Sequence, residues 1–191
     1  MLKLLKIRFL LLSLLITFLF SGCSKKDEPL KVSSISDTTV YNFLNQVIPL
    51  EKEYFQMNVF IDSIERAAFE KIEERDVHLF FKVEDSVFAV SQINSSEELI
   101  LNKNLLKNVR IETFNEDEFY NKRRSQIKEK IPFEEVGFNY FRRPIFTSDL
   151  SGCLFVFGFY CGGTFGKGKK AFYRRENGKW IFSQSIFEYV S

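Results

Sequence analysis

The stretch that decides the fold reads Tyr173-Arg174-Arg175-Glu176-Asn177-Gly178-Lys179-Trp180-Ile181-Phe182. Asn-Gly between two β-rich runs is the strongest short signal for a two-residue hairpin, because a type I′ turn needs positive φ at both central residues. The register set by this turn pairs opposite charges, a cation with an aromatic ring, and two aromatic rings: Glu176 with Lys179, Arg175 with Trp180, and Tyr173 with Phe182. These local signals agree, so the sequence predicts an antiparallel hairpin here.

Two further β-rich runs precede this hairpin. The four runs cover residues 139–147, 152–161, 170–176 and 179–190, and turn-forming residues separate them at 148–151, 162–168 and 177–178. We therefore expect an α+β fold with N-terminal helices packed on a C-terminal antiparallel β-meander of about four strands. Residues 37–191 form its single domain, mainly helical over residues 37–132 and a β-meander over residues 138–191.

Helical periodicity dominates the N-terminal part of this domain. Asp37 is expected to cap a helix that Pro49 ends; its apolar residues follow helical spacing, at Val40, Phe43, Leu44, Val47 and Ile48. A second helical pattern covers residues 61–74. Asn115 opens a third helix that Pro132 ends, and this helix is expected on the surface, since its inward stripe is thin: Phe119, Ile127 and Ile131.

The segment between the second and third helices is harder to interpret. Residues 77–83 are rich in β-formers and predict a strand. Residues 85–92 fit either its hairpin partner or a short helix capped by Asp85 or Ser86, and periodicity alone does not separate the two.

Cys153 and Cys161 are an even pair, but their spacing argues against a disulfide. On one straight strand they lie on the same face, roughly 26 Å apart. A disulfide needs Cα atoms within about 7 Å. We predict two free, buried thiols unless Gly158 reverses the chain.

The first 22 residues have the pattern of a secretory signal. Lys3, Lys6 and Arg8 precede an apolar core that is too short to span a bilayer, and Ser21-Gly22 ends it. With Cys23 next, this segment resembles the lipobox of bacterial lipoproteins, although Phe20 stands where leucine is usual. The resemblance implies cleavage after Gly22 and acylation of Cys23, which anchors the protein to a membrane. A buried free cysteine or a plain signal peptide is the alternative.

Residues 23–36 then form a polar tether between the anchor and the domain. Its Lys26-Asp27-Glu28 looks like the short signal that sends flavobacterial lipoproteins to the outer face of the outer membrane. That likeness implies a surface-exposed outer-membrane protein, with a periplasm-facing location as the alternative.

The C-terminal part resembles small uncharacterised lipoproteins of flavobacteria. The resemblance covers roughly residues 80–191 and rests on four motifs: Arg143-Pro144-Ile145-Phe146, Tyr160-Cys161-Gly162-Gly163, Gly166-Lys167-Gly168 and Gly178-Lys179-Trp180. Relatives often carry a second cysteine near the position of Phe165, which this chain lacks. The resemblance implies no activity.

The charge balance argues against a nucleic-acid partner. The whole chain has 27 basic and 25 acidic residues, but three of the basic ones belong to the signal, which leaves 24 against 25 in the mature protein. Nucleic-acid binders carry a clustered basic face. We expect no nucleic-acid partner.

The residues that could support catalysis lie in sequence contexts that do not fit a catalytic site. Residues 163–169 match the spacing of a phosphate-binding loop, but Lys170 follows where Ser or Thr would hold Mg²⁺, and a strand comes next. A glycine-rich hairpin loop with solvated lysines is the simpler interpretation. His78 is the only histidine, and the acidic pairs fall on polar faces: Glu73-Glu74, Glu97-Glu98, Glu116 to Glu118 and Glu134-Glu135. We therefore predict no catalytic, cofactor-binding or metal-binding residue.

We expect a non-enzymatic binding module on a lipid anchor, with a protein, peptide or glycan partner. The predicted partner surface is an exposed aromatic patch on the sheet, formed by Phe141, Phe155, Phe157, Phe159, Phe172 and Tyr173. An envelope-acting hydrolase and an immunity or inhibitor lipoprotein are the alternatives.

Overall fold

A mixed β-sheet is the centre of the computed structural model, which describes residues 33–55, 59–61, 71–94, 101–132, 135–162 and 165–190. The predicted signal segment, Cys23 and the predicted tether up to residue 32 lie outside the described residues. The strands are β1 (Val59–Ile61), β2 (Arg110–Glu112), β3 (Phe138–Phe141), β4 (Ile145–Phe146), β5 (Gly152–Gly162), β6 (Phe165–Glu176) and β7 (Lys179–Val190). The helices are α2 (Asp37–Val47), α3 (Glu74–Phe80), α4 (Val83–Asn94) and α5 (Glu116–Glu129).

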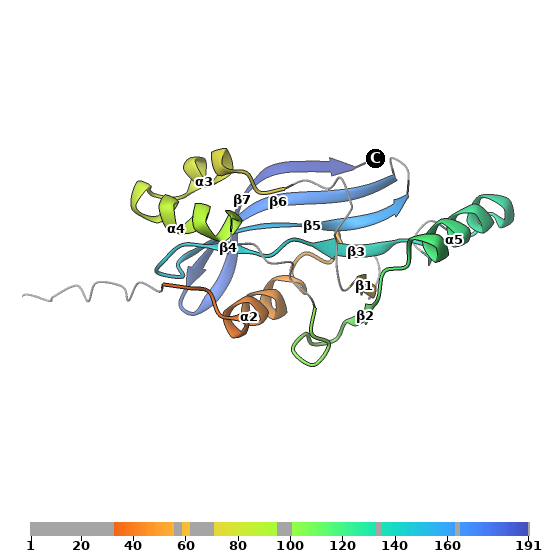
Figure 1. The fold of residues 1–191 in the computed structure, drawn as a ribbon, viewed down its shortest axis with the longest axis horizontal. Helices are drawn as coiled ribbons and strands as arrows, with labels where there is room; N and C mark the ends of the chain where they lie inside the picture. Colours follow the sequence, from red (N-terminus) through yellow and green to blue (C-terminus); the bar gives the residue numbers. More distant parts are fainter. Residues whose placement is uncertain are drawn as a thin grey trace, which may run out of the picture. The chain divides into compact units, whose positions relative to one another are not determined.

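The sheet confirms the α+β class and is larger than predicted. Its order is β2-β1-β3-β5-β6-β7, and β4 pairs with β5 beside β3 (Figure 1). Strands β3, β5, β6 and β7 are antiparallel, whereas β1 is parallel to both β2 and β3. The prediction of a four-stranded meander missed β1 and β2, which come from the part expected to be helical.

The β6–β7 hairpin has the predicted turn and register. Asn177 and Gly178 have φ values of 50° and 79°, as a type I′ turn requires. The pairs are those expected: Glu176 with Lys179, Arg175 with Trp180, and Tyr173 with Phe182. Further along, two register shifts insert Ser183 and Ile186 as extra residues in β7, which places a β-bulge at each.

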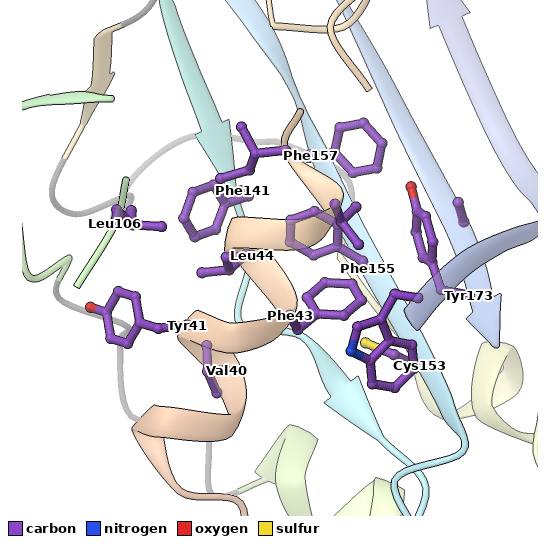
Figure 2. Close-up of a cluster of buried hydrophobic side chains, with 14 of the residues drawn as sticks. Val40, Tyr41, Phe43, Leu44, Leu106, Phe141, Cys153, Phe155, Phe157 and Tyr173 are labelled. Atoms are coloured by element: carbon purple, nitrogen blue, oxygen red, sulfur yellow. The ribbon is translucent and has the colours of Figure 1, made fainter. Parts of the chain in front are cut away.

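Strand β5 lies in the middle of the sheet and is buried on both faces. Cys153, Phe155 and Phe157 belong to one hydrophobic core, which α2 covers (Figure 2). Leu154 and Val156 belong to a second core on the opposite face, where α3, α4 and α5 contribute apolar side chains. The chain therefore forms three layers, with helices on both faces of the sheet.

The other predicted strands need two corrections. Residues 139–147 form two short strands, β3 and β4, separated by Arg142, Arg143 and Pro144. Strand β6 begins at Phe165, so Gly166 to Gly168, predicted as loop, belong to the strand. Gly158 and Gly168 pair across β5 and β6, and Tyr140 lies over both of them, which explains why glycine is tolerated inside these strands.

Helices α2 and α5 lie where the sequence predicted them. The cap of α2 is Ser36 rather than Asp37, because the Ser36 Oγ accepts a hydrogen bond from the Thr39 amide. Asn115 caps α5 as expected, with its side-chain oxygen 3.0 Å from the Glu118 amide nitrogen. The predicted inward position of Ile127 is wrong, since this side chain is 70% exposed.

The predicted strand over residues 77–83 is wrong, because most of this segment forms α3. Glu73 and Asp76 form a capping box, in which each side chain meets the other's backbone N–H, and this local signal outweighs the β-propensity of Val77 and Phe80. The helical alternative for residues 85–92 is correct, since they belong to α4, but neither Asp85 nor Ser86 caps this helix, because it begins at Val83. Of the predicted helix over residues 61–74, Ile61 lies in β1, Glu74 begins α3, and residues 62–70 are outside the described part.

Cys153 and Cys161 are buried and form no disulfide, as predicted. They occupy one continuous strand, so Gly158 does not reverse the chain. Within the described ranges, no helix has the length and apolar character needed to cross a membrane.

Candidate functional site

The six aromatic residues predicted as a partner surface lie in the core. Each is at most 7% exposed, so the prediction of an exposed patch is wrong: Phe141, Phe155, Phe157, Phe159, Phe172 and Tyr173. Helices cover both faces of the sheet, which buries alternate residues on both sides. Figure 2 shows Phe43 and Leu44 of α2 in the same core as four of the six: Phe141, Phe155, Phe157 and Tyr173.

Two neighbouring lysines of β6 place buried charges next to the two hydrophobic cores, one on each face of the sheet. Lys169 and Lys170 point to opposite faces of the sheet, as successive strand residues do. The Lys169 Nζ lies 3.1 Å from Oε2 of Glu51, and the Lys170 Nζ lies 2.8 Å from Oδ2 of Asp76. All four side chains are buried. The prediction of solvated lysines is therefore wrong for this pair, although Lys167 is half-buried at the start of the same run.

On the α2 face, Glu51 is the centre of a small polar network. Its second oxygen accepts a hydrogen bond from the Tyr173 hydroxyl at 2.6 Å. Burial, reinforced by the Glu51 carboxylate, raises the pKa of Tyr173 far above its ordinary value. Lys169 also lies 4.1 Å from the centre of the Phe182 ring, which adds a cation–π contact. These contacts fix the segment after α2 to the sheet.

On the opposite face, Asp76 has two roles. Its Oδ2 binds Lys170 and also accepts the Glu73 backbone N–H at 2.8 Å, within the capping box of α3. One carboxylate thus both starts the helix and holds it on β6. A charge in this position is matched and hydrogen-bonded, as a buried ion requires.

Helix α4 is fixed to β4 and its turn by side-chain to backbone bonds. Asp85 accepts hydrogen bonds from the Ser148 amide at 3.0 Å and the Ser148 hydroxyl at 2.6 Å. Gln92 exchanges two hydrogen bonds with the Phe146 backbone, at 2.7 and 3.0 Å, in the manner of an adjacent strand. These buried and half-buried polar groups hold the layers together.

The described structure has a groove between α5 and the β1–β2 edge of the sheet. One hollow of about 630 Å³ and a second of about 270 Å³ share lining residues: Asn115, Glu118, Lys122, Glu135 and Val136. Glu118 and Lys122 form an exposed ion pair at 2.7 Å, and this hydrogen bond lowers the pKa of Glu118. A carboxylate of this kind stays ionised near neutral pH and does not serve as a proton donor.

The remaining predicted polar groups are scattered. His78 is exposed on α3, with its Nε2 3.6 Å from Glu74, and Glu73 pairs with Arg75 at 2.7 Å. Glu97 and Glu98 lie outside the described residues, as does Glu134. Among the residues that the structure describes, no group of three His, Cys, Asp or Glu side chains is placed to hold a metal ion.

Sequence reasoning missed two exposed apolar surfaces. The first is the edge strand β7, where Ile181, Phe182, Phe187 and Val190 are between 43% and 82% exposed. The second, which we call the helical ridge, consists of Leu79 in α3 and Val83 and Val87 in α4. The four-residue spacing of Val83 and Val87 would have indicated this part of the ridge, had their segment been recognised as helical, whereas Leu79 belongs to α3, which ends at Phe80.

Comparisons with known proteins find no similarity: no family model matches the chain, and neither the curated proteins nor the solved structures give a match.

Proposed function

We propose that this protein is a lipid-anchored envelope protein that binds an extended segment of a protein or peptide partner along the outer edge of β7. The observation that carries the binding proposal is β7 itself. It is a twelve-residue strand at the end of the sheet, paired with β6 on one side. Such an edge offers a row of backbone hydrogen-bonding groups to an added strand.

Apolar side chains are exposed on both faces of this edge. Ile181 and Phe187 pair with Arg174 and Lys170 and therefore lie on the α3 face of the sheet. By the same register, Phe182 and Val190 lie on the α2 face. An added strand continues both faces of a sheet, so its side chains would cover apolar residues on each side.

The edge also lacks the charges that usually protect exposed strands. Lys179 and Glu188 are the charged residues of β7, and Glu188 lies 3.9 Å from Lys169. The bulges at Ser183 and Ile186 leave two regular runs, 179–182 and 187–190. A short partner segment fits one such run, whereas open-ended stacking of copies is disfavoured.

The interior charged groups favour binding over catalysis. Glu51 pairs with Lys169, and Asp76 pairs with Lys170. These pairs fix the segment after α2 and the start of α3 to the sheet. We therefore assign these groups to stability and the binding function to the strand edge.

Peptide display against the mature chain, residues 23–191 with Cys23→Ser, tests the binding proposal. We expect selected peptides to alternate apolar and polar residues and to shift the backbone NMR signals of residues 179–190. Phe187→Lys should weaken binding at least about tenfold. Ile127→Lys, at a more exposed apolar site on α5, should leave binding unchanged. Peptides that shift only signals of the α5 groove would overturn the proposal, as would a dimer of the chain formed through β7.

A separate experiment tests the anchor. Cells are grown with a clickable fatty acid, and we expect label on the wild-type chain and none on Cys23→Ala. Protease treatment of intact cells should then remove the labelled protein, because the proposed location is the outer face of the outer membrane. A wild-type chain without label would end the anchor proposal, and a labelled but protected chain would place the protein on the periplasmic side.

A further inference from the structure

We infer that the helical ridge, Leu79, Val83 and Val87, lies on the lipid surface to which the chain is anchored. This inference rests on the anchor in the proposed function and adds an orientation to it. The three side chains are 70%, 89% and 80% exposed. Val83 and Val87 are one turn apart on α4, and Leu79 is in the last turn of α3.

The ridge is held outward by the contacts on the other side of the same helices. Asp76 of α3 is bound to Lys170, and Asp85 and Gln92 of α4 are bound to the backbone of Ser148 and Phe146. Val77 and Ala89 are fully buried in the second core. Rotating either helix to hide its exposed residues would break these contacts, so the ridge stays exposed in the isolated domain.

The charges around the ridge cancel. Six exposed charged residues lie along the segment from residue 71 to residue 87, three basic and three acidic: Lys71, Arg75, Lys82, Glu73, Glu74 and Glu84. Attraction to anionic headgroups is therefore small, and the ridge fits the apolar boundary of a bilayer rather than a charged surface. Contact with lipid should depend little on the anionic fraction of the membrane.

The start of the described chain lies within reach of the ridge. The Arg143 guanidinium donates hydrogen bonds to the Ile35 carbonyl and to Asp37, which fixes this start beside the β3–β4 connection. Ser148, which binds Asp85 of α4, lies five residues after Arg143. Five residues of extended chain cover roughly 17 Å. Figure 1 shows α4 and the start of α2 at the same end of the sheet.

The number of residues between Cys23 and the described domain limits the distance between the proposed lipid anchor and the domain. Ten Cα–Cα steps separate Cys23 from Ser33, which span at most about 35 Å. A lipid on Cys23 therefore keeps this end of the domain close to the bilayer, with the ridge at an effective concentration of the order of millimolar. Three apolar side chains are too few to hold a protein on a membrane alone, so the contact depends on the anchor.

The test uses an anchor that does not depend on acylation. The chain from residue 23 with Cys23→Ser keeps both hydrophobic cores, whose residues all lie between positions 35 and 186. An N-terminal polyhistidine tag captures it on phosphatidylcholine vesicles that contain a nickel-chelating lipid. A solvent-sensitive NBD dye is attached at Val83→Cys, with Ile127→Cys on α5 as the matched exposed control. The parent chain corrects for any labelling of Cys153 and Cys161.

We expect the dye at position 83 to shift to the blue and to brighten at least about twofold on capture, and the dye at position 127 to stay unchanged. Adding Leu79→Ser and Val87→Ser should abolish the change at position 83, and anionic lipid should not enhance it. Equal responses at positions 83 and 127 would overturn the inference. So would a change at position 83 that grows with protein concentration without vesicles, because the ridge would then contact protein. Absence of fatty-acid label in cells would contradict the proposed anchor. Absence of the dye response would contradict only the proposed contact between the helical ridge and the membrane.

Discussion

The Nζ of Lys170 lies 2.8 Å from Oδ2 of Asp76, with 2% and 4% of the two side chains exposed. This ion pair connects the central part of β6 to the first turn of α3. Lys169, the preceding residue, makes the corresponding contact with Glu51 on the opposite face. Two adjacent residues of one strand therefore hold helical layers on both sides of the sheet.

Removing one member of the Lys170–Asp76 pair should destabilise the domain strongly. In Lys170→Met, Asp76 stays buried without its cation, and we expect the free energy of unfolding to fall by about 3–5 kcal/mol. Lys167→Met, at a half-buried position of the same strand, should change it by less than about 1 kcal/mol. Urea unfolding measures both, and equal effects of the two substitutions would contradict the assigned role of the pair.

The buried Tyr173 predicts a loss of stability at alkaline pH. Burial and the Glu51 carboxylate raise the pKa of its phenol in the folded state. Below pH 10 the phenol is protonated in both states, so its contribution is complete. Above pH 10 the unfolded phenol ionises while the folded one stays protonated, and the free energy of unfolding should fall by about 1.4 kcal/mol per pH unit.

Tyr173→Phe separates this effect from other titrations. It should cost about 1.5–3 kcal/mol at pH 7, because Glu51 loses a hydrogen bond at 2.6 Å. Above pH 10, the free energy of unfolding of Tyr173→Phe should fall less steeply with pH than that of the wild type. The difference in slope should be about 1.4 kcal/mol per pH unit, the contribution of one proton. Unfolding curves from pH 7 to 11.5 measure the difference, and parallel declines in the two proteins would refute the prediction.

Features set by neighbouring residues could be predicted from the sequence. The Asn177-Gly178 turn predicted the pairing of β6 with β7 next to the turn, and Asn115 predicted the start of α5. The bulges at Ser183 and Ile186 could not be foreseen, because they depend on how β7 follows the twist of the sheet.

Features that depend on distant segments were predicted poorly. The aromatic run of β5 predicts one exposed face, although a continuous apolar run also fits a strand covered by helices on both faces. Gly166 and Gly168 indicated a loop, since nothing local shows that the β5 backbone lies against Gly166 or that Tyr140 and Tyr189 fill the space next to Gly168. The exposed surfaces on β7 and the helical ridge depend on the positions of these layers, which no local sequence pattern shows.

The contact of Gln92 with the Phe146 backbone should hold α4 on the short strand β4. Gln92→Glu replaces the donor 2.7 Å from the Phe146 carbonyl with an acceptor, and the two oxygens then repel each other. We expect a loss of about 1–3 kcal/mol and faster amide exchange at Phe146. Ser91→Ala, at an exposed position of the same helix, serves as the control. Unchanged exchange at Phe146 in Gln92→Glu would show that this contact does not hold the strand.

The two buried thiols should be unreactive in the native protein. Burial raises the pKa of Cys153, which lowers its thiolate fraction at neutral pH, and Cys161 is also buried. In the mature chain with Cys23→Ser, Ellman's reagent should detect both thiols after unfolding and react slowly before it. Rapid reaction without denaturant would show that the strand end at Cys161 opens readily.

Gly158 and Gly168 should resist replacement by alanine, to different degrees. A Cβ at Gly158 would lie 2.3 Å from the Lys167 carbonyl oxygen, so the strands themselves would have to separate. A Cβ at Gly168 would first meet side chains, 2.4 Å from the ring of Tyr189 and 2.6 Å from the Tyr140 hydroxyl, and Tyr189 can rotate away. We expect both variants to lose about 1–3 kcal/mol, with Gly158→Ala the worse, although alanine loses less backbone entropy on folding than glycine. Thermal and urea unfolding of the two variants give the comparison. A smaller loss in Gly158→Ala would mean that the β5–β6 pair can separate at this point, and that the bond between the Tyr140 and Tyr189 hydroxyls, 3.0 Å long, is the stiffer part of the structure.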